Sequence, residues 1–388
     1  MNYIDRLVAE LCPDGVDFYT IDELITLDFG TRITKSKDAG TIYPVYGGGG
    51  ASFRTDNYNR EDKYVVSRFA MSEKCVRYVS GKFWMLDSGF TYSVKDESLL
   101  SYKYISYWLL NAQQEIYACS SQSAQRNLKT AEFKRFEVPV PPLEIQEAIV
   151  EILDKFTNLE TELETELEAR TLQYEYYRDS LFEALDCPRV PLGSFARLVR
   201  GSGMPKTDFS ESGVGAIHYG QIYTKFGTAT AEVIAHVPED KAKKLAVVNP
   251  GDVIVANTSE NLEDVCKAVA WVGDSDIVTG GHATVIKAPE QNAKFISYYM
   301  ATGRFNKDKR RHAFGTKVID VAPKNLAKIE FPVPPLEEQQ RIVDILDRFD
   351  SLTTSLSEGL PAELAARRSQ YEYYRDQLLT FPRKGDNQ

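Results

Sequence analysis

The chain has 388 residues, 43% of them hydrophobic and 26% charged, as in an ordinary globular protein of two or three domains. Its first residues are too polar for a signal peptide, and no apolar run reaches the roughly 18 residues that span a membrane, so we expect a cytoplasmic protein. Five scattered cysteines and four histidines lack metal-ligand spacing, which argues against a disulfide framework and a zinc site. The formal charge of −10 has the wrong sign for a simple nucleic-acid binder, so its distribution matters.

Residues 1–16 are predicted to be a short N-terminal segment, followed by a first globular domain at 17–137. Short alternating runs of β-branched and aromatic residues, such as KYVVSRF and FTYSV, indicate an α+β domain with a twisted sheet. The glycines of VYGGGG are followed by neither GK[ST] nor a helix signal, which favours a turn over a phosphate loop. Near the end of this domain four basic residues stand against one acidic residue: Arg126, Lys129, Lys134 and Arg135 against Glu132.

Residues 138–189 are predicted to form a helical spacer region. After VPVPPLE, apolar residues recur at heptad spacing from Ile145 onward. The stretch ETELETELEA repeats a tetrad, and the two consecutive steps of four through Leu159, Leu163 and Leu167 form a stutter in the heptad pattern. About 40 residues of helix would make a strut roughly 60 Å long. A solvated acidic face on an ordinary coiled coil is the alternative interpretation.

Residues 190–330 are predicted to be a second α+β domain, with strand-like runs such as DVIVAN and ATVIKA. Its last part, 303–328, holds eight basic residues against two acidic ones. Residues 331–388 are predicted to be a second helical spacer region. The apolar seam of its helix includes four leucines, Leu352, Leu356, Leu360 and Leu364. Gly359 and Pro361 interrupt that helix, so we expect a kink or a short break there.

Two motifs occur twice in the same order. VPVPPLE at 138–144 is matched by FPVPPLE at 331–337, and QYEYYRD at 173–179 recurs letter for letter at 370–376. The offsets of 193 and 197 residues mean that the second copy has four extra residues between its motifs. The N-terminal LVAELCPDGV also resembles LFEALDCPRV, which follows the first QYEYYRD. The pattern predicts a cyclically permuted repeat with neighbouring termini, a pseudo-two-fold axis and two antiparallel helices.

The predicted helices carry the acidic charge. Residues 143–184 hold 12 acidic and 3 basic side chains and 336–381 hold 9 and 5, a net −13 that leaves +3 for the rest of the chain. Lys and Arg clusters with aromatic and amide neighbours suit contacts with phosphates and base edges, although a run of charge is also common on an ordinary solvated surface. A basic stretch precedes the Pro-Pro motif in both copies, and this repetition favours a nucleic-acid-binding surface in each domain.

No catalytic constellation is recognisable in the sequence. It has no GxGxxG in a strand–helix context, no nucleophile elbow and no carboxylates at metal-site spacing. The Pro-Pro motif reads VPPLE, not the Asn/Asp-Pro-Pro-aromatic form with which amino-methyltransferases hold a flipped base. The chain is therefore interpreted as non-catalytic, with no cofactor of its own.

With these motifs in place, the chain resembles the specificity subunit of type I restriction-modification enzymes over essentially its whole length. The resemblance rests on the paired PxPPLExQ motifs, the paired QYEYYRD, GLPAELAAR at 359–367 and the tetrad repeat. YPVYGGGG at 43–50 and HYGQIYT at 218–224 are similar to the openings of that family's two target-recognition domains. The implied fold is α+β, with two globular target-recognition domains separated by two long antiparallel coiled-coil helices.

The resemblance implies a bipartite site on double-stranded DNA, with one half-site read in the major groove by each domain and a nonspecific spacer between them. It also implies two methyltransferase subunits, which would flip and methylate adenine with S-adenosylmethionine, and motor-nuclease subunits that cut unmodified DNA. A coiled-coil scaffold without a nucleic-acid role and a two-headed DNA-binding regulator without the enzyme are the alternatives. Recognition domains vary widely within the family, so base-reading residues cannot be transferred from it.

Thirteen residues are predicted to contact DNA, because they combine cationic, amide or aromatic side chains with a place near these motifs. They are Arg32, Lys35, Tyr46, Arg54, Gln125, Arg126, Lys206, Tyr219, Gln221, Tyr223, Arg310, Arg311 and Lys317. Tyr219 and Tyr223 fit a place in the hydrophobic core equally well.

Overall fold

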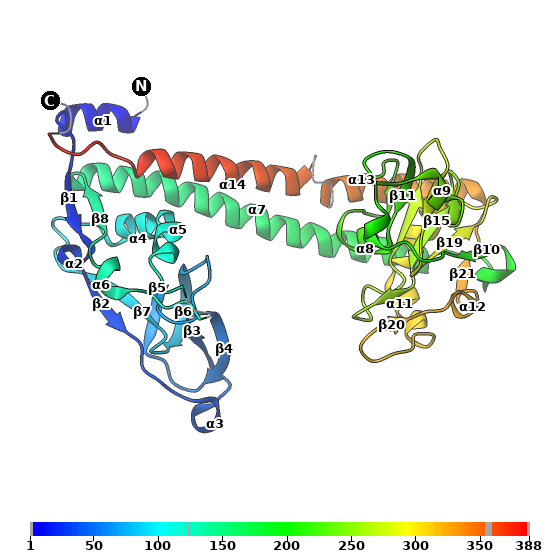
Figure 1. Ribbon diagram of the computed structural model, residues 1–388, viewed down its shortest axis with the longest axis horizontal. Coiled ribbons are helices and arrows are strands. Elements are labelled where there is room, and N and C mark those ends of the chain that lie inside the picture. The colour runs from blue at the N-terminus through cyan, green and yellow to red at the C-terminus, as the bar shows by residue number, and fades with distance from the viewer. Residues whose placement is uncertain (1–2, 123–124, 354–358, 386–388) are drawn as a thin grey trace. The chain divides into compact units, whose positions relative to one another are not determined.

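The computed structural model describes residues 3–122, 125–353 and 359–385 (Figure 1). The chain folds into two compact units. Unit 1 consists of Met1–Glu162 together with Ala365–Gln388, and unit 2 consists of Leu163–Leu364. Two helices, α7 (Leu143–Glu183) and α14 (Gly359–Leu378), contribute residues to both units. Among the described helices, none combines the length and apolarity that crossing a bilayer requires.

Unit 1 is built on a six-stranded sheet with the order β2-β7-β5-β6-β3-β4. In chain order its strands are β2 (Ile25–Phe29), β3 (Tyr43–Gly47), β4 (Gly50–Thr55), β5 (Arg60–Ser67), β6 (Val76–Met85) and β7 (Gly89–Val94). Its helices are α1 (Tyr3–Leu11), α2 (Ile21–Leu24), α3 (Lys35–Asp38), α4 (Tyr102–Asn111), α5 (Gln113–Ala118) and α6 (Thr130–Phe133). A separate antiparallel pair joins β1 (Asp17–Thr20) to β8 (Glu137–Val140), just before α7.

Unit 2 contains a five-stranded sheet with the order β10-β19-β15-β17-β12 and a four-stranded sheet with the order β13-β11-β18-β14. The first comprises β10 (Arg197–Arg200), β12 (Ala229–Thr230), β15 (Val253–Ala256), β17 (Ala268–Trp271) and β19 (Ala283–Lys287). The second comprises β11 (Val214–Ile217), β13 (Ala235–Val237), β14 (Ala246–Val248) and β18 (Ile277–Thr279). All four residues of the central strand β15 are apolar and buried, as expected for a strand that is covered on both faces.

The helices of unit 2 are short apart from α13. They are α8 (Tyr219–Thr224), α9 (Glu239–Ala242), α10 (Ala293–Met300), α11 (Gly303–Arg310), α12 (Pro323–Leu326) and α13 (Leu336–Thr353). Side chains of Asn292 and Thr302 cap the amino ends of α10 and α11. Two further strand pairs join β9 (Arg189–Pro191) to β21 (Glu330–Pro332) and β16 (Thr258–Ser259) to β20 (Ile319–Asp320).

The internal duplication is visible in the strand order of the two units. The order β2-β7-β5-β6 in unit 1 is matched by β10-β19-β15-β17 in unit 2, with antiparallel pairing throughout both series. The pair β1-β8 has its counterpart in β9-β21. The repeat that the two motifs predict therefore extends over both globular regions.

Equivalent side chains anchor each sheet to its helix. The buried Gln146 accepts a hydrogen bond from Ser101 N at 2.8 Å and donates to the carbonyls of Leu99 and Pro141. Its counterpart Gln339 accepts from Asn292 N at 2.9 Å and donates to Gln291 Oε1 and the Pro334 carbonyl. About two turns further on, Asp154 binds Lys103 and Tyr107, and Asp347 binds Lys294 and Tyr298 in the same way. The glutamine of PxPPLExQ therefore fixes the start of each long helix to its own sheet.

The helices pair across the two copies of the repeat. In unit 1, Phe156 of α7 stacks on Tyr374 of α14 with ring centroids 5.7 Å apart, and Glu160 binds Arg368. These pairings run in opposite directions along the two helices, so the helices are antiparallel. In unit 2, Tyr177 stacks on Phe349 at 5.6 Å, and these residues are the counterparts of Tyr374 and Phe156. Each copy supplies the phenylalanine of one stack and the tyrosine of the other.

The two ends of the described chain meet in unit 1. Val16 N donates to the Pro382 carbonyl at 3.0 Å, and Lys384 N donates to the Val16 carbonyl at 3.0 Å. Helix α1 also packs near the end of α14, through Ile4 and Leu378 in one hydrophobic core. The segments before β1 and after α14 therefore lie side by side in unit 1, and this contact supports the prediction that the termini are neighbours.

The predicted seam of the helices needs correction at several positions. Leu153 is fully buried, whereas Ile152 is only partly buried, because α4 packs against this part of α7 and turns its buried face. The spacer leucines Leu159, Leu163, Leu167 and Leu360 are half-buried, and Leu364 is buried. Leu352 is 52% exposed in the last turn of α13, so the seam prediction is wrong there, and Leu356 lies outside the described residues.

The predicted interruption of the second helix is found at Gly359. Helix α13 ends at Thr353, and α14 begins at Gly359 with a φ of +75°, which is not helical backbone. A side chain at this position would meet the carbonyl oxygens of Ser351 and Leu352 at 2.7 and 2.8 Å. Only glycine permits both the conformation and the close approach.

Candidate nucleic-acid interface

One end of each sheet gathers loops from distant parts of the chain. In unit 1 the register places Phe29 beside Phe90 and Phe90 beside Val66, so the loops after β2 and β5 and before β7 start together. The same rows in unit 2 join Arg200 to Thr284 and Ala256 to Ala283. We call these regions the loop ends of the two units. In unit 1 the segment after β2, with α3, lies on the side of the unit away from α7 (Figure 1).

Glycines let the loops touch backbone to backbone at both loop ends. A side chain on Gly30 would meet the Leu86 carbonyl oxygen at 2.2 Å, and one on the equivalent Gly201 would meet the Gly280 carbonyl oxygen at 1.9 Å. The VYGGGG turn joins the loop end of unit 1, where Gly48 N donates to Ser88 Oγ and a side chain on Gly48 would overlap the Phe69 carbonyl. Gly30, Gly48 and Gly201 are therefore close-packing positions, whereas Gly49 and Gly50 have open space around them. VYGGGG forms the turn of the β3–β4 hairpin, as the sequence predicts.

The loop end of unit 1 carries two exposed cations and a half-buried arginine that lies over aromatic rings. Arg32 and Lys35 are exposed just after Gly30. Arg68 lies over the rings of Phe29 and Phe69, at 5.0 and 4.6 Å from their centroids. The sequence interpretation missed Arg68, although its place directly after the buried strand in KYVVSRF was a usable signal.

The other predicted residues of unit 1 divide between this end and the interior. Met71 N donates to the Arg126 carbonyl, which puts the loop with Gln125 and Arg126 beside the segment after β5. Gln125 is exposed, and Arg126 is half-buried over the Tyr117 ring at 4.5 Å. Tyr46 packs edge-on against Phe83 at 5.6 Å. Arg54 is exposed at the far end of the β3–β4 hairpin and donates to the Ile42 carbonyl at 2.6 Å.

Helix α8, formed by HYGQIYT, contacts segments at the loop end of unit 2. The side chain of Gln221 accepts from His218 N at 2.8 Å and caps the helix. The Tyr223 hydroxyl donates to the Thr258 carbonyl at 2.5 Å, and the ring of Tyr219 lies 5.1 Å from that of His282. Gln221 and Tyr223 therefore have structural partners. Tyr219 and Tyr223 pack against a hydrophobic core, which favours the core interpretation that the sequence left open for these two residues.

Exposed cations surround this loop end as well. Lys206, Arg310, Arg311 and Lys317 are all exposed, and Arg311 lies 3.5 Å from Asp308 in a surface ion pair. Lys309, in the same basic stretch, is instead 2% exposed and donates to the carbonyls of Glu263 and Val265 at 2.8 and 2.7 Å. Burial lowers the pKa of Lys309, and its ammonium group holds α11 against the segment before β17. Lys309 faces the interior, so the prediction that the whole basic stretch binds phosphate is wrong at this residue.

The sequence interpretation also missed His282 and Arg200 in unit 2. His282 is exposed with a φ of +68°, and Arg200 is exposed at the end of β10, 3.5 Å from Asp320.

His218 caps the amino end of α8. The imidazole Nδ1 of His218 accepts from Gly220 N at 3.1 Å, so this nitrogen is unprotonated. Burial lowers the pKa of His218, and the positive charges of Lys206 and His282 lower it further.

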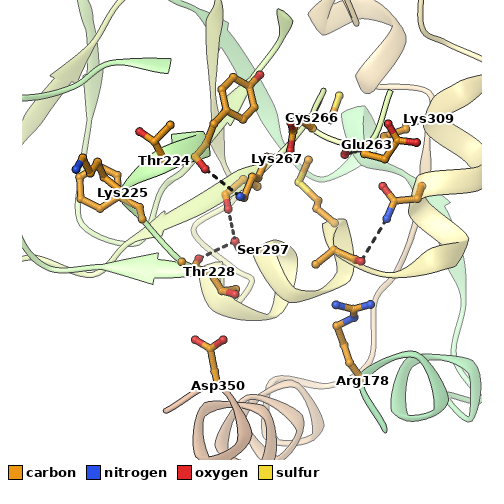
Figure 2. A pocket seen from close by; sticks show the side chains of 18 of the residues that line it. Arg178, Thr224, Lys225, Thr228, Glu263, Cys266, Lys267, Ser297, Lys309 and Asp350 are labelled. Carbon is orange, nitrogen blue, oxygen red and sulfur yellow. Dashed lines mark hydrogen bonds between the residues drawn. The ribbon is translucent and has the colours of Figure 1, made fainter. Parts of the chain in front are cut away.

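One cavity of unit 2 offers no activated nucleophile for catalysis among the described residues that line it. It measures about 510 Å³ and is lined by Arg178 on α7, Asp350 on α13 and residues of the sheet region (Figure 2). Burial raises the pKa of its Cys266 thiol to about 12, so the thiolate is absent at neutral pH. Within the described ranges, no three His, Cys, Asp or Glu side chains gather closely enough to hold a metal ion.

Two repeated sheet domains, each with exposed cations at one end and each anchored to the paired helices, define a class of proteins with two equivalent domains joined by long helices. A family model described as the type I restriction modification DNA specificity domain matches residues 13–170 and again 190–366. The chain belongs to the family of type I restriction-modification specificity subunits. Its role is therefore that of the non-catalytic DNA-specificity subunit of such a complex.

Relatives align along nearly the whole chain. The specificity subunit of the Escherichia coli type I restriction enzyme EcoR124I/EcoR124II is 30% identical over 99% of this chain and 98% of its own length. A putative type I specificity subunit of Haemophilus influenzae, S.HindORF215P, is 26% identical over 97% of this chain and 99% of its own length. The crystal structure of an S subunit from M. genitalium covers 94% of this chain and 95% of its own, with a TM-score of 0.55 and 18% identity, and so supports the fold.

Proposed function

We propose that the two loop ends each read one half of a bipartite site on double-stranded DNA. The target-recognition domains are residues 17–137 and 190–330, the helical spacer regions are 138–189 and 331–388, and residues 1–16 complete the repeat. The observation that carries this proposal is the shared backbone framework of the loop ends, which presents different exposed side chains in the two units. Shared framework with different readers is what recognition of two different half-sites requires.

The exposed cations at the loop ends are proposed to bind phosphates. Arg32, Lys35, Arg310, Arg311 and Lys317 are all exposed, as phosphate contact needs. From the structure we add the exposed Arg200 as a phosphate contact, and the half-buried Arg68 and the exposed His282 as hydrogen-bond donors to the DNA. Gln125, Arg126 and Lys206 are kept as candidates for base or backbone contact. Tyr46, Arg54, Tyr219, Gln221 and Tyr223 are proposed to act by shaping the surface.

Catalysis is proposed to come from partner subunits in the cytoplasm. Two methyltransferase subunits would bind the repeated helices, one for each copy of QYEYYRD, and supply S-adenosylmethionine-dependent adenine methylation. Motor-nuclease subunits would cut unmodified DNA. Tyr176 and Tyr373, at the same place in the two copies, are 69% and 59% exposed, which supports two equivalent docking surfaces on the helices.

Methylome sequencing of cells that carry this chain with its methyltransferase partner tests the proposal. The expected result is methylated adenine in a motif of two short conserved blocks separated by a spacer of fixed length. A gel shift on the purified chain should show weak binding that tightens with the partner, because the net charge of −10 opposes binding by the chain alone. Sequence-specific binding of equal strength without the partner would favour a two-headed regulator instead.

A further inference from the structure

The turn between Phe314 and Asp320 carries two exposed apolar side chains at the loop end of unit 2. Phe314 is 64% exposed and Val318 is 58% exposed. These are the highest values among the large apolar side chains described in unit 2 outside its long helices. Two exposed apolar side chains on one short turn, with cationic residues beside them, have the composition of an interaction site rimmed by polar residues.

The backbone of this turn is held in place. Phe314 N donates to the Asp320 carbonyl at 3.0 Å, and Asp320 N donates to the Phe314 carbonyl at 2.8 Å. Strand β20 pairs with β16, which ties the turn to the segment after β15. Gly315 has a φ of +120°, and a side chain there would meet the Val318 carbonyl oxygen at 1.9 Å. The two apolar side chains are therefore presented on a preorganised turn.

Positively charged residues flank the turn, and they favour a partner with negative charge on both sides of an apolar or uncharged centre. Arg310, Arg311 and Lys317 are exposed on both sides of Phe314 along the chain. Cations that flank an apolar centre match a DNA duplex, in which phosphates line the groove and the base edges lie between them. An acidic protein surface would be the other occupant, but it would not explain why the turn continues the loop end.

The corresponding loop of unit 1 differs in chemistry. Its described residues include the exposed Gln122 and Gln125 and the half-buried Arg126, and its Leu128 is buried. No large apolar side chain is exposed among the described residues of this loop, 121–122 and 125–128. The apolar turn is thus a difference between the two readers and not a property of the common framework.

We propose that the Phe314–Val318 turn contacts bases of double-stranded DNA and discriminates sequence in the half-site read by unit 2. This inference rests on the proposed function of the loop ends. The flanking cations bind the phosphates, and the phenyl ring and the valine methyl groups contact base edges or an unstacked base step. Such contacts carry sequence information without ion pairing.

The test uses the full chain assembled with its methyltransferase partner and a duplex whose unit 2 half-site is assigned by exchanging residues 190–330. Phe314→Ala should lower the preference for the cognate duplex over one with a scrambled unit 2 half-site by about tenfold. The unit 1 half-site and the slope of log affinity against log salt should stay unchanged, because no charge is removed. Val272→Ala is the matched control, since Val272 is 44% exposed but directly follows Trp271, at the end of β17 opposite to the loop end.

Further measurements on variants, on the methylated motif and on partner binding separate the possible outcomes. Phe314→Trp should keep the preference and change its fluorescence on adding cognate duplex but not on adding the partner alone. Lys317→Ala should lower the salt slope by about one without altering the methylated motif. An unchanged methylated motif in Phe314→Ala would overturn the inference while leaving the proposed function intact. Loss of partner binding in the absence of DNA would also overturn it, by showing that the turn docks protein. A wild-type complex without any sequence preference would overturn both.

Discussion

Units 1 and 2 agree where they hold the long helices and differ where their loops are exposed. Asp154 and Asp347 bind equivalent lysine and tyrosine partners, and Gln146 and Gln339 make equivalent buried hydrogen bonds. At the loop ends, unit 1 presents an arginine over two phenylalanine rings, whereas unit 2 presents a rigid apolar turn between cations. The comparison teaches that the anchoring contacts define the scaffold and that the loop ends are free to diverge.

The largest effect is expected at the paired anchors. Gln146→Ala and Gln339→Ala should each lower the free energy of unfolding by about 3 kcal/mol, because each change leaves several buried backbone or side-chain groups without a hydrogen-bond partner. Urea denaturation combined with hydrogen exchange of each unit would measure this. Gln377→Ala is the control, since Gln377 is exposed. A large loss in one unit and none in the other would break the equivalence of the scaffolds.

Much of the scaffold could be predicted from the amino-acid sequence alone, because the sequence contains an internal repeat. Identical motifs reveal the duplication, and the glycine at 359 reveals the interruption of the second helix. The buried face of α7 could not be predicted, because α4 packs on it from a position 40 residues earlier and makes Leu153 the core residue. The burial of Lys309 depends on two carbonyls, those of Glu263 and Val265, which no local pattern indicates.

The next effect concerns the exposed cations of unit 2. Arg310→Ala combined with Arg311→Ala should weaken binding to all duplexes and reduce the slope of log affinity against log salt by up to about two, as the loss of two phosphate contacts does. Titrations between 50 and 200 mM salt, about the usual range for such slopes, would measure it. The methylated motif should stay the same. A changed half-site with an unchanged slope would show that these arginines read bases.

A smaller effect is expected in the aromatic stacks between the helices. Double-mutant cycles on Phe156 with Tyr374 and on Phe349 with Tyr177 should give similar coupling energies of about 1 kcal/mol, because the two stacks have nearly the same geometry. Alanine is the replacement at each position, and thermal or urea unfolding supplies the energies. Coupling in only one of the two stacks would show that the copies have diverged in their packing.

The smallest effect is a pH dependence confined to unit 2, which holds all four histidines. Burial, together with the positive charges of Lys206 and His282, lowers the pKa of His218 below that in the unfolded chain, and its Nδ1 accepts from Gly220 N. Its contribution is present above about pH 6.5 and is lost as the pH falls below that value. Hydrogen exchange of α8 should therefore speed up at acid pH. His218→Asn, which caps without titrating, should remove this dependence, and its persistence would exclude His218 as the cause.

On this account, the loop ends recognise the half-sites and the long helices set the distance between them. Deleting one tetrad, Glu164 to Leu167, from α7 tests this most directly. A tetrad adds about 6 Å of helix and a net turn of about 40°, whereas one base pair adds about 3.4 Å and about 35°. A four-residue deletion also returns the apolar face almost to its original direction, so the seam stays packed. Methylation mapping of this variant should show both half-sites unchanged and the spacer shortened by one base pair, or at most two. An active enzyme with an unaltered spacer, or with altered half-sites, would contradict the account.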